Sequence, residues 1–476
     1  MTLKKNFIYS SILTVSKYLF PLIIYPYISR TLGLSNIGIV NFVDNLINYF
    51  VFISMMGIAT VGVREIAAVR NTKEQLSKTF SSLLFLTIIT TLAAIAILWI
   101  AMYTVQMLMP YRDLLYVGII KLVFNLFVIE WFYAGMEDFK YITNRSILIR
   151  CLYMLCIFLF VKESSDYKIY YTLSAVVVFV NAVVDLLYMH RYVRFSFSAI
   201  NIRPYYKAYF IMGVYVLLTN VYISLNPVWL GFVTNTDEVG YYTTATKLYN
   251  FIMAFLLSFT TILFPRVSNL LAKGEKEQFW EKIRLAFEAI YLFAFPTMIY
   301  MVIAGPSLLH MMVGDGFEGA YLPFRIITPL ILIVGIEQIL VIQILMASHY
   351  DNIVLRNSFI GAVATLLCNL LLTSYMGAVG SAMVWVIAEL VILFLSIIAI
   401  YRQFRVTINF QRLFCYFISY TPLLLLSFFL YQYIDNEYAL IVSTAVLSTI
   451  YVTILEVFIL KNQVVHLLLM SIKHKE

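Results

Sequence analysis

The sequence has few charged residues. Asp, Glu, Lys and Arg make up 12% of the 476 residues, whereas hydrophobic residues make up 62%, and the mean hydropathy is +0.89. A soluble domain carries about a quarter charged residues, so this chain lacks the charge to cover a water-exposed surface. Apolar runs of about 20 residues recur along it, the length that crosses a bilayer as a helix. We predict an all-α polytopic membrane protein and exclude a β-barrel, because the runs are continuous rather than alternating.

The motifs of soluble chemistry are also missing. The net charge is +8, but the basic residues lie in short loops on alternate sides of the apolar runs, which argues against a nucleic-acid partner. Gly314 and Gly316 mark a tight loop, yet no Gly-Lys-Ser/Thr follows to form a phosphate-binding loop. We expect no enzyme activity, no cofactor and no ATP-driven pump. The cysteines lie in apolar runs and form neither a spaced metal motif nor a disulfide framework: Cys151, Cys156, Cys368 and Cys415.

The apolar runs predict fourteen transmembrane helices. Lys4 and Lys5 precede the first run, and no small-residue cleavage site follows, so we expect an uncleaved first helix rather than a signal peptide. Of the 33 Lys and Arg residues, 24 fall in the loops or adjacent span ends on one side, four do so on the other side, and five lie deeper inside the spans. Because basic residues gather in cytoplasmic loops, both termini are predicted to be cytoplasmic. The approximate spans are 7–29, 36–60, 79–104, 112–134, 141–161, 168–189, 206–232, 239–265, 281–304, 322–347, 353–375, 377–401, 411–433 and 438–460.

A polar, basic segment at 190–206, which contains Pro204, separates the first six spans from the last eight. It predicts a linker between two bundles. The predicted regions are an N-terminal six-helix bundle at 1–194, a cytoplasmic linker at 195–205, a C-terminal six-helix bundle at 206–405, and a region at 406–476 with two further helices and a cytoplasmic tail.

A short internal repeat suggests that the two bundles are related. Four residues recur 202 positions later in the chain: Gly38, Leu46, Asn48 and Arg64 correspond to Gly240, Leu248, Asn250 and Arg266. An offset of six spans preserves the direction of the chain. We therefore expect a parallel repeat about an axis along the membrane normal.

Polar residues inside the predicted spans are candidates for a transport cavity. A charged side chain there costs about 2.5–3.5 kcal/mol to insert, so it should face protein or water rather than lipid. Lys17 lies on a polar face of the first span, Asp44 shares a face with Asn48, and Lys247 shares one with Asn250. Asp44 and Lys247 both lie about 12 Å below the outer end of their spans. We predict that they face each other across a central cavity, with Asp44 tuning Lys247; separate local contacts are the alternative.

Two acidic residues are candidates for ion coupling. Glu337 and Glu389 lie near mid-membrane in spans 10 and 12. Either could bind a coupling proton or sodium ion, or simply hydrogen-bond a neighbouring helix.

Other charged residues favour structural roles. Lys121 and Glu130 lie on opposite faces of span 4, nine residues apart, so they cannot both line one cavity. We predict a structural ion pair for Glu130, with Arg145 and Arg150 both close by in span 5. Asp185 is predicted to be an interfacial residue, and His310 to lie at a loop end.

Four stretches together resemble one family of transporters. ISRTLGLSNIG follows the first span, and EWFYAGMEDFKYITNR follows the fourth. The other two are GDGFEGAYLPFRIITPLILIVGIEQILVIQILMASHYDN and GAVGSAMVWVIAEL. The sequence resembles, in order over residues 1–405, the Wzx-type polysaccharide flippases of the multidrug/oligosaccharidyl-lipid/polysaccharide (MOP) exporter superfamily.

The resemblance implies two six-helix bundles related by a pseudo-twofold axis, as in multidrug exporters of the same superfamily. It also implies a function: moving undecaprenyl-pyrophosphate-linked repeat units of O-antigen or capsule across the bacterial cytoplasmic membrane by alternating access. Cationic cavity residues would receive the pyrophosphate, and Lys17, Lys247 and, at shallower depth, Arg325 match that role. The implied partners are membrane lipids, the lipid-linked oligosaccharide, and a polysaccharide polymerase and glycosyltransferases. The alternatives are a multidrug or cation antiporter and a non-transporting scaffold or scramblase of the glycan machinery.

Overall fold

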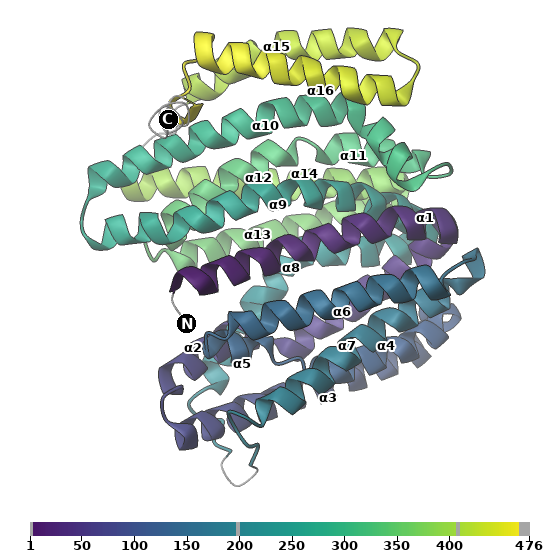
Figure 1. Ribbon diagram of the computed structural model, residues 1–476, viewed down its shortest axis with the longest axis vertical. Helices are drawn as coiled ribbons and strands as arrows, with labels where there is room; N and C mark the ends of the chain where they lie inside the picture. The colour runs from purple at the N-terminus through teal and green to yellow at the C-terminus, as the bar shows by residue number, and fades with distance from the viewer. Residues whose placement is uncertain (1–2, 197–199, 406–409, 466–476) are drawn as a thin grey trace. The chain divides into compact units, whose positions relative to one another are not determined.

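The computed structural model describes residues 3–196, 200–405 and 410–465, and within these ranges it contains helices and loops but no β-strand (Figure 1). The prediction of an all-α membrane protein is confirmed. Ten helices in the described part are long and apolar enough to cross a membrane, and two of them, Ile12–Val69 and Asp351–Phe404, each cover two predicted spans. Each predicted span lies mostly on helical residues, although the span at 112–134 is interrupted between α4 and α5. The count of fourteen crossings stays a prediction.

Packing divides the chain into two units, residues 1–240 and 241–476. In the first unit, α3, α4, α6 and α7 run alongside one another (Figure 1). Its helices are α1 (Leu3–Met55), α2 (Ile58–Val69), α3 (Lys73–Thr104), η1 (Gln106–Tyr111), α4 (Arg112–Asn125), α5 (Glu130–Gly135), α6 (Phe139–Phe160), η2 (Ser164–Asp166), α7 (Tyr167–Met189) and α8 (Tyr206–Val233).

The helix α9 (Thr236–Ala272) begins at the end of the first unit and continues into the second. The remaining helices of the second unit are α10 (Lys276–Val313), η4 (Glu318–Ala320), α11 (Tyr321–Ile327), α12 (Leu330–Gln338), η5 (Ile339–Met346), α13 (Asp351–Cys368), η6 (Asn369–Thr373), α14 (Ser374–Phe404), α15 (Phe410–Tyr433), α16 (Glu437–Ile454) and η7 (Leu455–Ile459).

The division between the units falls after α8, later than the predicted linker at 195–205. The reason is that α8 packs closely against α1. A methyl group on Gly231 would lie 2.2 Å from Cδ2 of Phe42, so the missing side chain allows this approach. The predicted bundle bounds therefore stay a prediction, with α8 packed on the first six helices.

Two glycines break long helices where the sequence predicts turns between spans. Gly33, inside α1, has φ 75° and ψ 170°, and Gly377, inside α14, has φ 56° and ψ −131°. A side chain at such positive φ is strained, whereas glycine adopts it readily. The chain thus leaves one predicted span and enters the next without a long loop.

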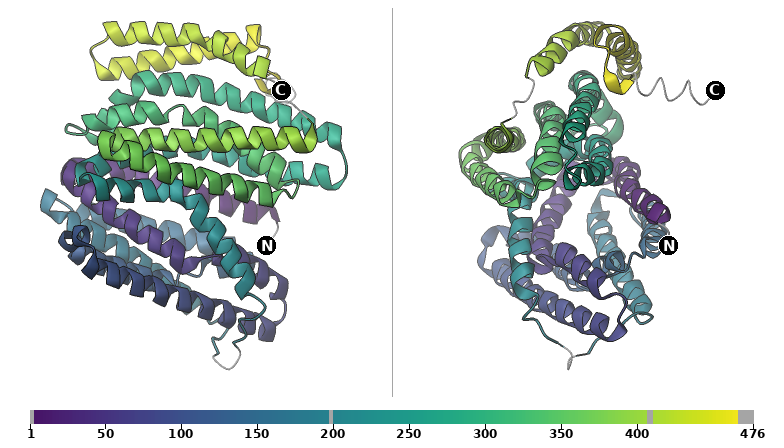
Figure 2. Two further views of the ribbon diagram at one scale, coloured as in Figure 1. Left: turned by 180° about the vertical axis from the view of Figure 1, so that it is seen from behind. Right: turned by 90° about the vertical axis from the view of Figure 1, so that its left-hand side faces the viewer.

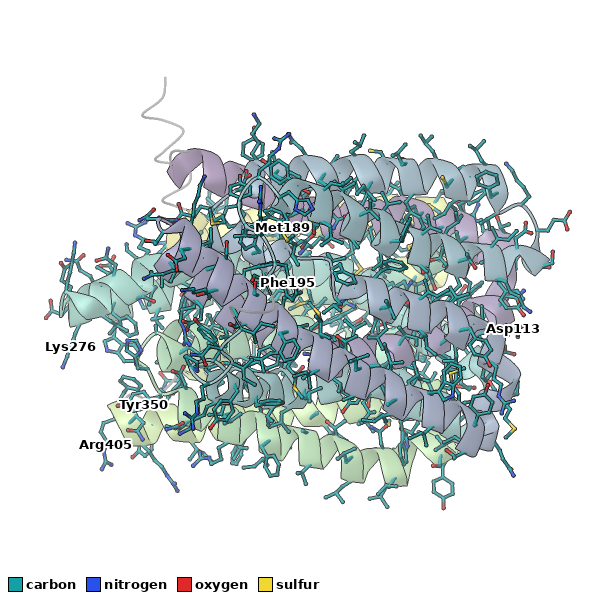
Figure 3. All side chains as sticks on the ribbon, turned by 90° about the horizontal axis from the view of Figure 1, so that it is seen from below. Asp113, Met189, Phe195, Lys276, Tyr350 and Arg405 are labelled. Carbon is teal, nitrogen blue, oxygen red and sulfur yellow. The ribbon has the colours of Figure 1, made fainter. Side chains whose placement is uncertain are left out.

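The outward surface fits a membrane. Trp99 and Tyr103 near the end of α3 are 48% and 46% exposed, and the Tyr103 hydroxyl lies 2.7 Å from that of Tyr116 on α4. Exposed Trp and Tyr near helix ends are typical of the interface between lipid and water. Figure 3 shows the labelled polar residues Asp113 and Lys276 at helix ends, where charge meets water.

The C-terminal pair α15 and α16 lies against α10 in the second unit (Figure 2). A cluster of polar side chains stabilises the contact of this pair with α10. Arg412 Nε donates to Glu288 Oε1 at 2.8 Å, and the Tyr416 hydroxyl donates to Glu288 Oε2 at 2.9 Å. The Tyr420 hydroxyl donates to Glu456 at 2.7 Å, which ties α15 to η7.

Candidate functional site

An ion pair lies inside the first unit, between α1 and α4. The Lys121 ammonium contacts the Asp44 carboxylate, and the two side chains are 14% and 34% exposed. Asn48 Nδ2, one turn further along α1, donates to Asp44 Oδ2 at 3.2 Å. Asp44 thus has a cationic partner within its own unit, one that the sequence analysis did not assign to it.

The local sequence explains why the two helices come close enough for this pair. Gly118 and Lys121 share one face of α4, and Ile47 and Asp44 share one face of α1, each at a spacing of three residues. A methyl group on Gly118 would lie 2.4 Å from Cδ1 of Ile47. Because glycine has no side chain there, Ile47 packs onto the α4 backbone and Asp44 comes within reach of Lys121.

Tyrosines of α6 and α7 surround the ion pair. Lys121 Nζ lies 5.8 Å from the centre of the Tyr171 ring. The Tyr171 hydroxyl is buried and has no hydrogen-bond partner among the described residues. Tyr153 of α6 and Tyr170 of α7 lie close to each other and to Asp44. The result is a polar patch of one cation, one anion and several hydroxyls in an apolar bundle.

Such a patch suits an anionic ligand that competes with Asp44. The attraction between unlike charges grows as the dielectric constant falls, so a lysine here binds phosphate more strongly than one in water. Asn48 and the Tyr171 hydroxyl can donate hydrogen bonds to phosphate or sugar oxygens.

The other predicted cavity residues lie in different settings. Lys17 is exposed on α1, beside Val15 at 58% and Leu19 at 45% exposure. The role of Lys17 in a transport cavity stays a prediction. On α9, Lys247 is half-buried and Asn250 is exposed.

Arg325 is held by its neighbours in the second unit. Its Nε donates to the Val302 carbonyl of α10 at 3.1 Å, and its guanidinium lies 5.7 Å from the centre of the Tyr431 ring of α15. These contacts give Arg325 a place between α10, α11 and α15. The role of Arg325 in binding pyrophosphate stays a prediction.

Glu337 of α12 and Glu389 of α14 come together in the second unit. Their carboxyl groups lie close to each other in the interior of the unit. Trp385 Nε1 donates to Glu389 Oε1 at 3.0 Å, and Oε2 of Glu337 is buried with no partner among the described residues. Two ionised carboxylates this close repel each other, so a proton shared between them would favour the contact. The sequence suggests a role for each residue separately, and the structure brings them together.

A second charged cluster holds the first unit together. Arg145 of α6 forms ion pairs with Glu130 and Asp185, and Asp185 also accepts from the Ile129 N–H at 3.0 Å. The predicted ion pair of Glu130 is confirmed, with Arg145 rather than Arg150 as its partner. Asp185 is fully buried in the protein, where it bonds to α6 and to the turn before α5 rather than to its neighbours in sequence. Its position at the membrane interface stays a prediction.

Comparisons with known proteins now identify the family. Residues 3–271 match the model of the family described as Polysaccharide biosynthesis protein. The chain belongs to this polysaccharide biosynthesis family. A relative in Escherichia coli (strain K12), named "Putative O-antigen transporter", is 23% identical over 396 residues, which cover 82% of this chain and 94% of that protein.

Solved structures share the fold. The lipid II flippase MurJ, in an inward closed conformation, matches with a TM-score of 0.76 and 13% identity over 95% of this chain and 98% of that one. MATE in complex with MaL6 matches with a TM-score of 0.53 and 12% identity over 83% and 95% of the two chains. This member of the polysaccharide biosynthesis family therefore has a MurJ- and MATE-like fold, as the resemblance in sequence predicted.

Proposed function

We propose that the protein is a flippase for undecaprenyl-pyrophosphate-linked oligosaccharide repeat units. It would move them from the inner to the outer leaflet of the bacterial cytoplasmic membrane, with both termini cytoplasmic, for the synthesis of surface polysaccharide. The family, the name of the Escherichia coli relative and the fold shared with a lipid II flippase support this proposal. The observation that carries it is the largely buried Lys121 ammonium. It lies beside Tyr171, whose hydroxyl has no hydrogen-bond partner among the described residues.

The polar patch offers the charged head of the lipid a polar route across the membrane, because such a head cannot cross hydrocarbon unaided. As the pyrophosphate arrives, its oxygens replace the Asp44 carboxylate on Lys121, and Asn48 follows as a second donor. The sugars contact tyrosine and asparagine side chains, while the polyprenyl tail stays in lipid. Lys17, Lys247 and Arg325 would supply further positive charge along the route, and alternating access would expose it to each side in turn.

Glu337 and Glu389 are the proposed coupling site. The proton that joins the two carboxyl groups can leave or be replaced by Na⁺, since carboxylate oxygens bind both ions. Release of that proton places two negative charges in contact, and their repulsion favours a rearrangement of α12 against α14. An ion gradient would in this way drive the cycle.

Genetic complementation tests the role of Lys121. In a strain that lacks the gene, Lys121→Ala should abolish surface polysaccharide while the protein still reaches the membrane. Lys121→Arg should retain part of it, because the charge remains. Lys73→Ala, which removes an exposed lysine at the start of α3, is the matched control and should support normal polymer. Normal polymer from Lys121→Ala would exclude Lys121 as the phosphate-binding residue.

The carboxyl pair also favours a second candidate, a multidrug or cation antiporter, because acidic sites bind organic cations. Deletion of the gene would then raise drug accumulation and leave surface polysaccharide intact. A scramblase or scaffold of the glycan machinery predicts instead that lipid transfer is indifferent to an ion gradient. The flippase proposal predicts lost polymer, unchanged drug accumulation and dependence on the gradient. A polymerase and glycosyltransferases encoded nearby would be its functional partners.

A further inference from the structure

A pocket opens at the surface of the first unit, lined by residues of α6 and α7, which lie side by side. Its volume is about 410 Å³. It lies apart from the Lys121–Asp44 pair and shares no lining residue with it. The lining includes Asp138, Lys140, Asn144, Leu148, Val184 and Tyr188.

The walls of the pocket change from polar to apolar along α6. Lys140 and Asn144, near the beginning of the helix, are exposed. Leu148, two turns from Lys140, is 62% exposed. With a rise of 1.5 Å per residue, Lys140 and Leu148 lie about 12 Å apart along the helix axis, close to the thickness of one leaflet of hydrocarbon.

The apolar wall continues beyond the pocket as a stripe of leucines. Leu152, Leu155 and Leu159 are 50%, 53% and 66% exposed. At 100° per residue these leucines, together with Leu148 and Lys140, fall within an arc of about 120° on α6. A molecule with a polar head at Lys140 could therefore lay its tail along one continuous face of the helix.

The charged residues of the pocket determine which lipid head group it can bind. The Asp138 carboxylate is engaged, since it accepts from the Tyr188 and Tyr192 hydroxyls at 3.1 and 2.9 Å and from the Tyr141 N–H at 3.3 Å. Arg145 also lines the pocket, but its charge is already matched by Glu130 and Asp185. The exposed Lys140 ammonium is therefore the positive charge that the pocket offers to a ligand. Such a charge beside an apolar wall suits the phosphate of a lipid head.

We propose that this pocket binds a glycerophospholipid of the leaflet at the Lys140 end of α6, which we expect to be the cytoplasmic one. Lys140 and Asn144 hold its phosphate, and an acyl chain lies along Leu148 and Leu152. The bound lipid is a fixed component of the first unit and is distinct from any lipid that the protein transports. It stabilises the packing of α5, α6 and α7 around the ion pair of Arg145 with Asp185.

Native mass spectrometry of the intact purified protein, titrated with palmitoyl-oleoyl-phosphatidylglycerol, tests this. Lys140→Gln should weaken binding about fivefold, since a lysine near anionic lipid contributes about 1 kcal/mol. Leu148→Trp should weaken it as well, by filling the apolar half without changing the charge. Lys73→Ala, an exposed lysine outside the pocket, should bind as the wild type does.

A photoactivatable phospholipid provides a measurement that needs no variant. In proteoliposomes of the wild type, it should label peptides of α6 between Lys140 and Leu152 more than those of any other outward helix face. Equal binding by wild type, Lys140→Gln and Leu148→Trp would overturn the proposal, as would label spread evenly over all outward helices. Since transport is not measured in either experiment, failure of the lipid site leaves the proposed flippase function to its own tests.

Discussion

The Lys121 ammonium is paired with the Asp44 carboxylate across two transmembrane helices of the first unit. The pair is held by a glycine contact on the same faces of the two helices, where Gly118 meets Ile47. A charge pair in this setting is a poor source of stability, because desolvation offsets most of the attraction. Its presence is better explained by a ligand that uses the lysine.

A double substitution at Lys121 and Asp44 should therefore restore stability without restoring transport. Lys121→Met alone leaves Asp44 without its cation and should lower the free energy of unfolding by about 2–3 kcal/mol. Asp44→Asn with Lys121→Met should recover most of that loss while transport stays absent. Thermal unfolding in detergent and polymer synthesis in cells measure the two properties. Recovery of polymer in the double variant would show that the pair is only structural.

Gly118→Val should impair the site without removing any charge. The new side chain would meet Ile47, whose Cδ1 lies 2.4 Å from the position of an added methyl, and would push α1 away from α4. Overpacking of this kind costs about 1–3 kcal/mol. We expect reduced transport, and partial rescue when Ile47→Ala is added to make room. No rescue by Ile47→Ala would contradict the proposed contact.

Glu389→Gln should alter ion coupling rather than substrate binding. The amide keeps a hydrogen bond to Glu337 but cannot release a proton. We expect transport to lose its dependence on the ion gradient and its rate to fall, while binding of the lipid substrate is kept. Gradient-driven transport by Glu389→Gln at the wild-type rate would remove the carboxyl pair from the coupling mechanism. Glu277→Gln, at an exposed position near the start of α10, is a carboxyl control in the same unit.

His310 should make the attachment of α16 to α10 sensitive to pH. It lies beyond the predicted span at 281–304, and its ring nitrogens face Glu437 at 2.6 Å and Asp315 at 2.9 Å. Hydrogen bonds to Glu437 and then Asp315 raise the pKa of His310 above its ordinary 6.5. Glu318 and Tyr321, from η4 and α11, add further titratable groups beside these carboxylates.

The sign of the effect follows from the raised pKa. The stabilisation is fully present below the pKa of the unfolded state, about 6.5, and is lost as the pH rises through the higher pKa of the folded state. His310→Gln should therefore lower the melting temperature more at about pH 6 than at about pH 9. The gain is at most about 1 kcal/mol, as for other exposed ion pairs. A His310→Gln difference that does not change with pH would refute this role, and His190→Gln serves as the control.

The sequence predicts the helices well and the pairing of charges less well. Apolar runs long enough to span a bilayer have few alternatives to a helix, so each predicted span lies mostly on helical residues. Glu130 is close in sequence to Arg145 and Arg150, and its ion pair follows from that proximity. Asp44 and Lys121 are 77 positions apart, and the packing of α1 against α4 brings them together.

Contacts between residues far apart in sequence also explain where the structure adds to the predictions for other charged residues. Asp185 has basic neighbours in sequence, but its partners come from α6 and from the turn before α5, which no local pattern reveals. The sequence indicates a possible role in ion coupling for Glu337 and for Glu389 separately. Their contact depends on how α12 packs against α14, which the sequence does not reveal. Whether Asp44 also influences Lys247 stays a prediction.

Transfer of a purified lipid-linked oligosaccharide across proteoliposomes is the most direct test of the proposed function. An externally added glycosidase reports how much of the glycolipid reaches the outer leaflet after an ion gradient is imposed. Wild-type protein should expose glycolipid that was initially protected, and Lys121→Ala, reconstituted in equal amount, should leave it protected. Exposure at equal rates by both proteins, or no exposure by the wild type, would contradict the account.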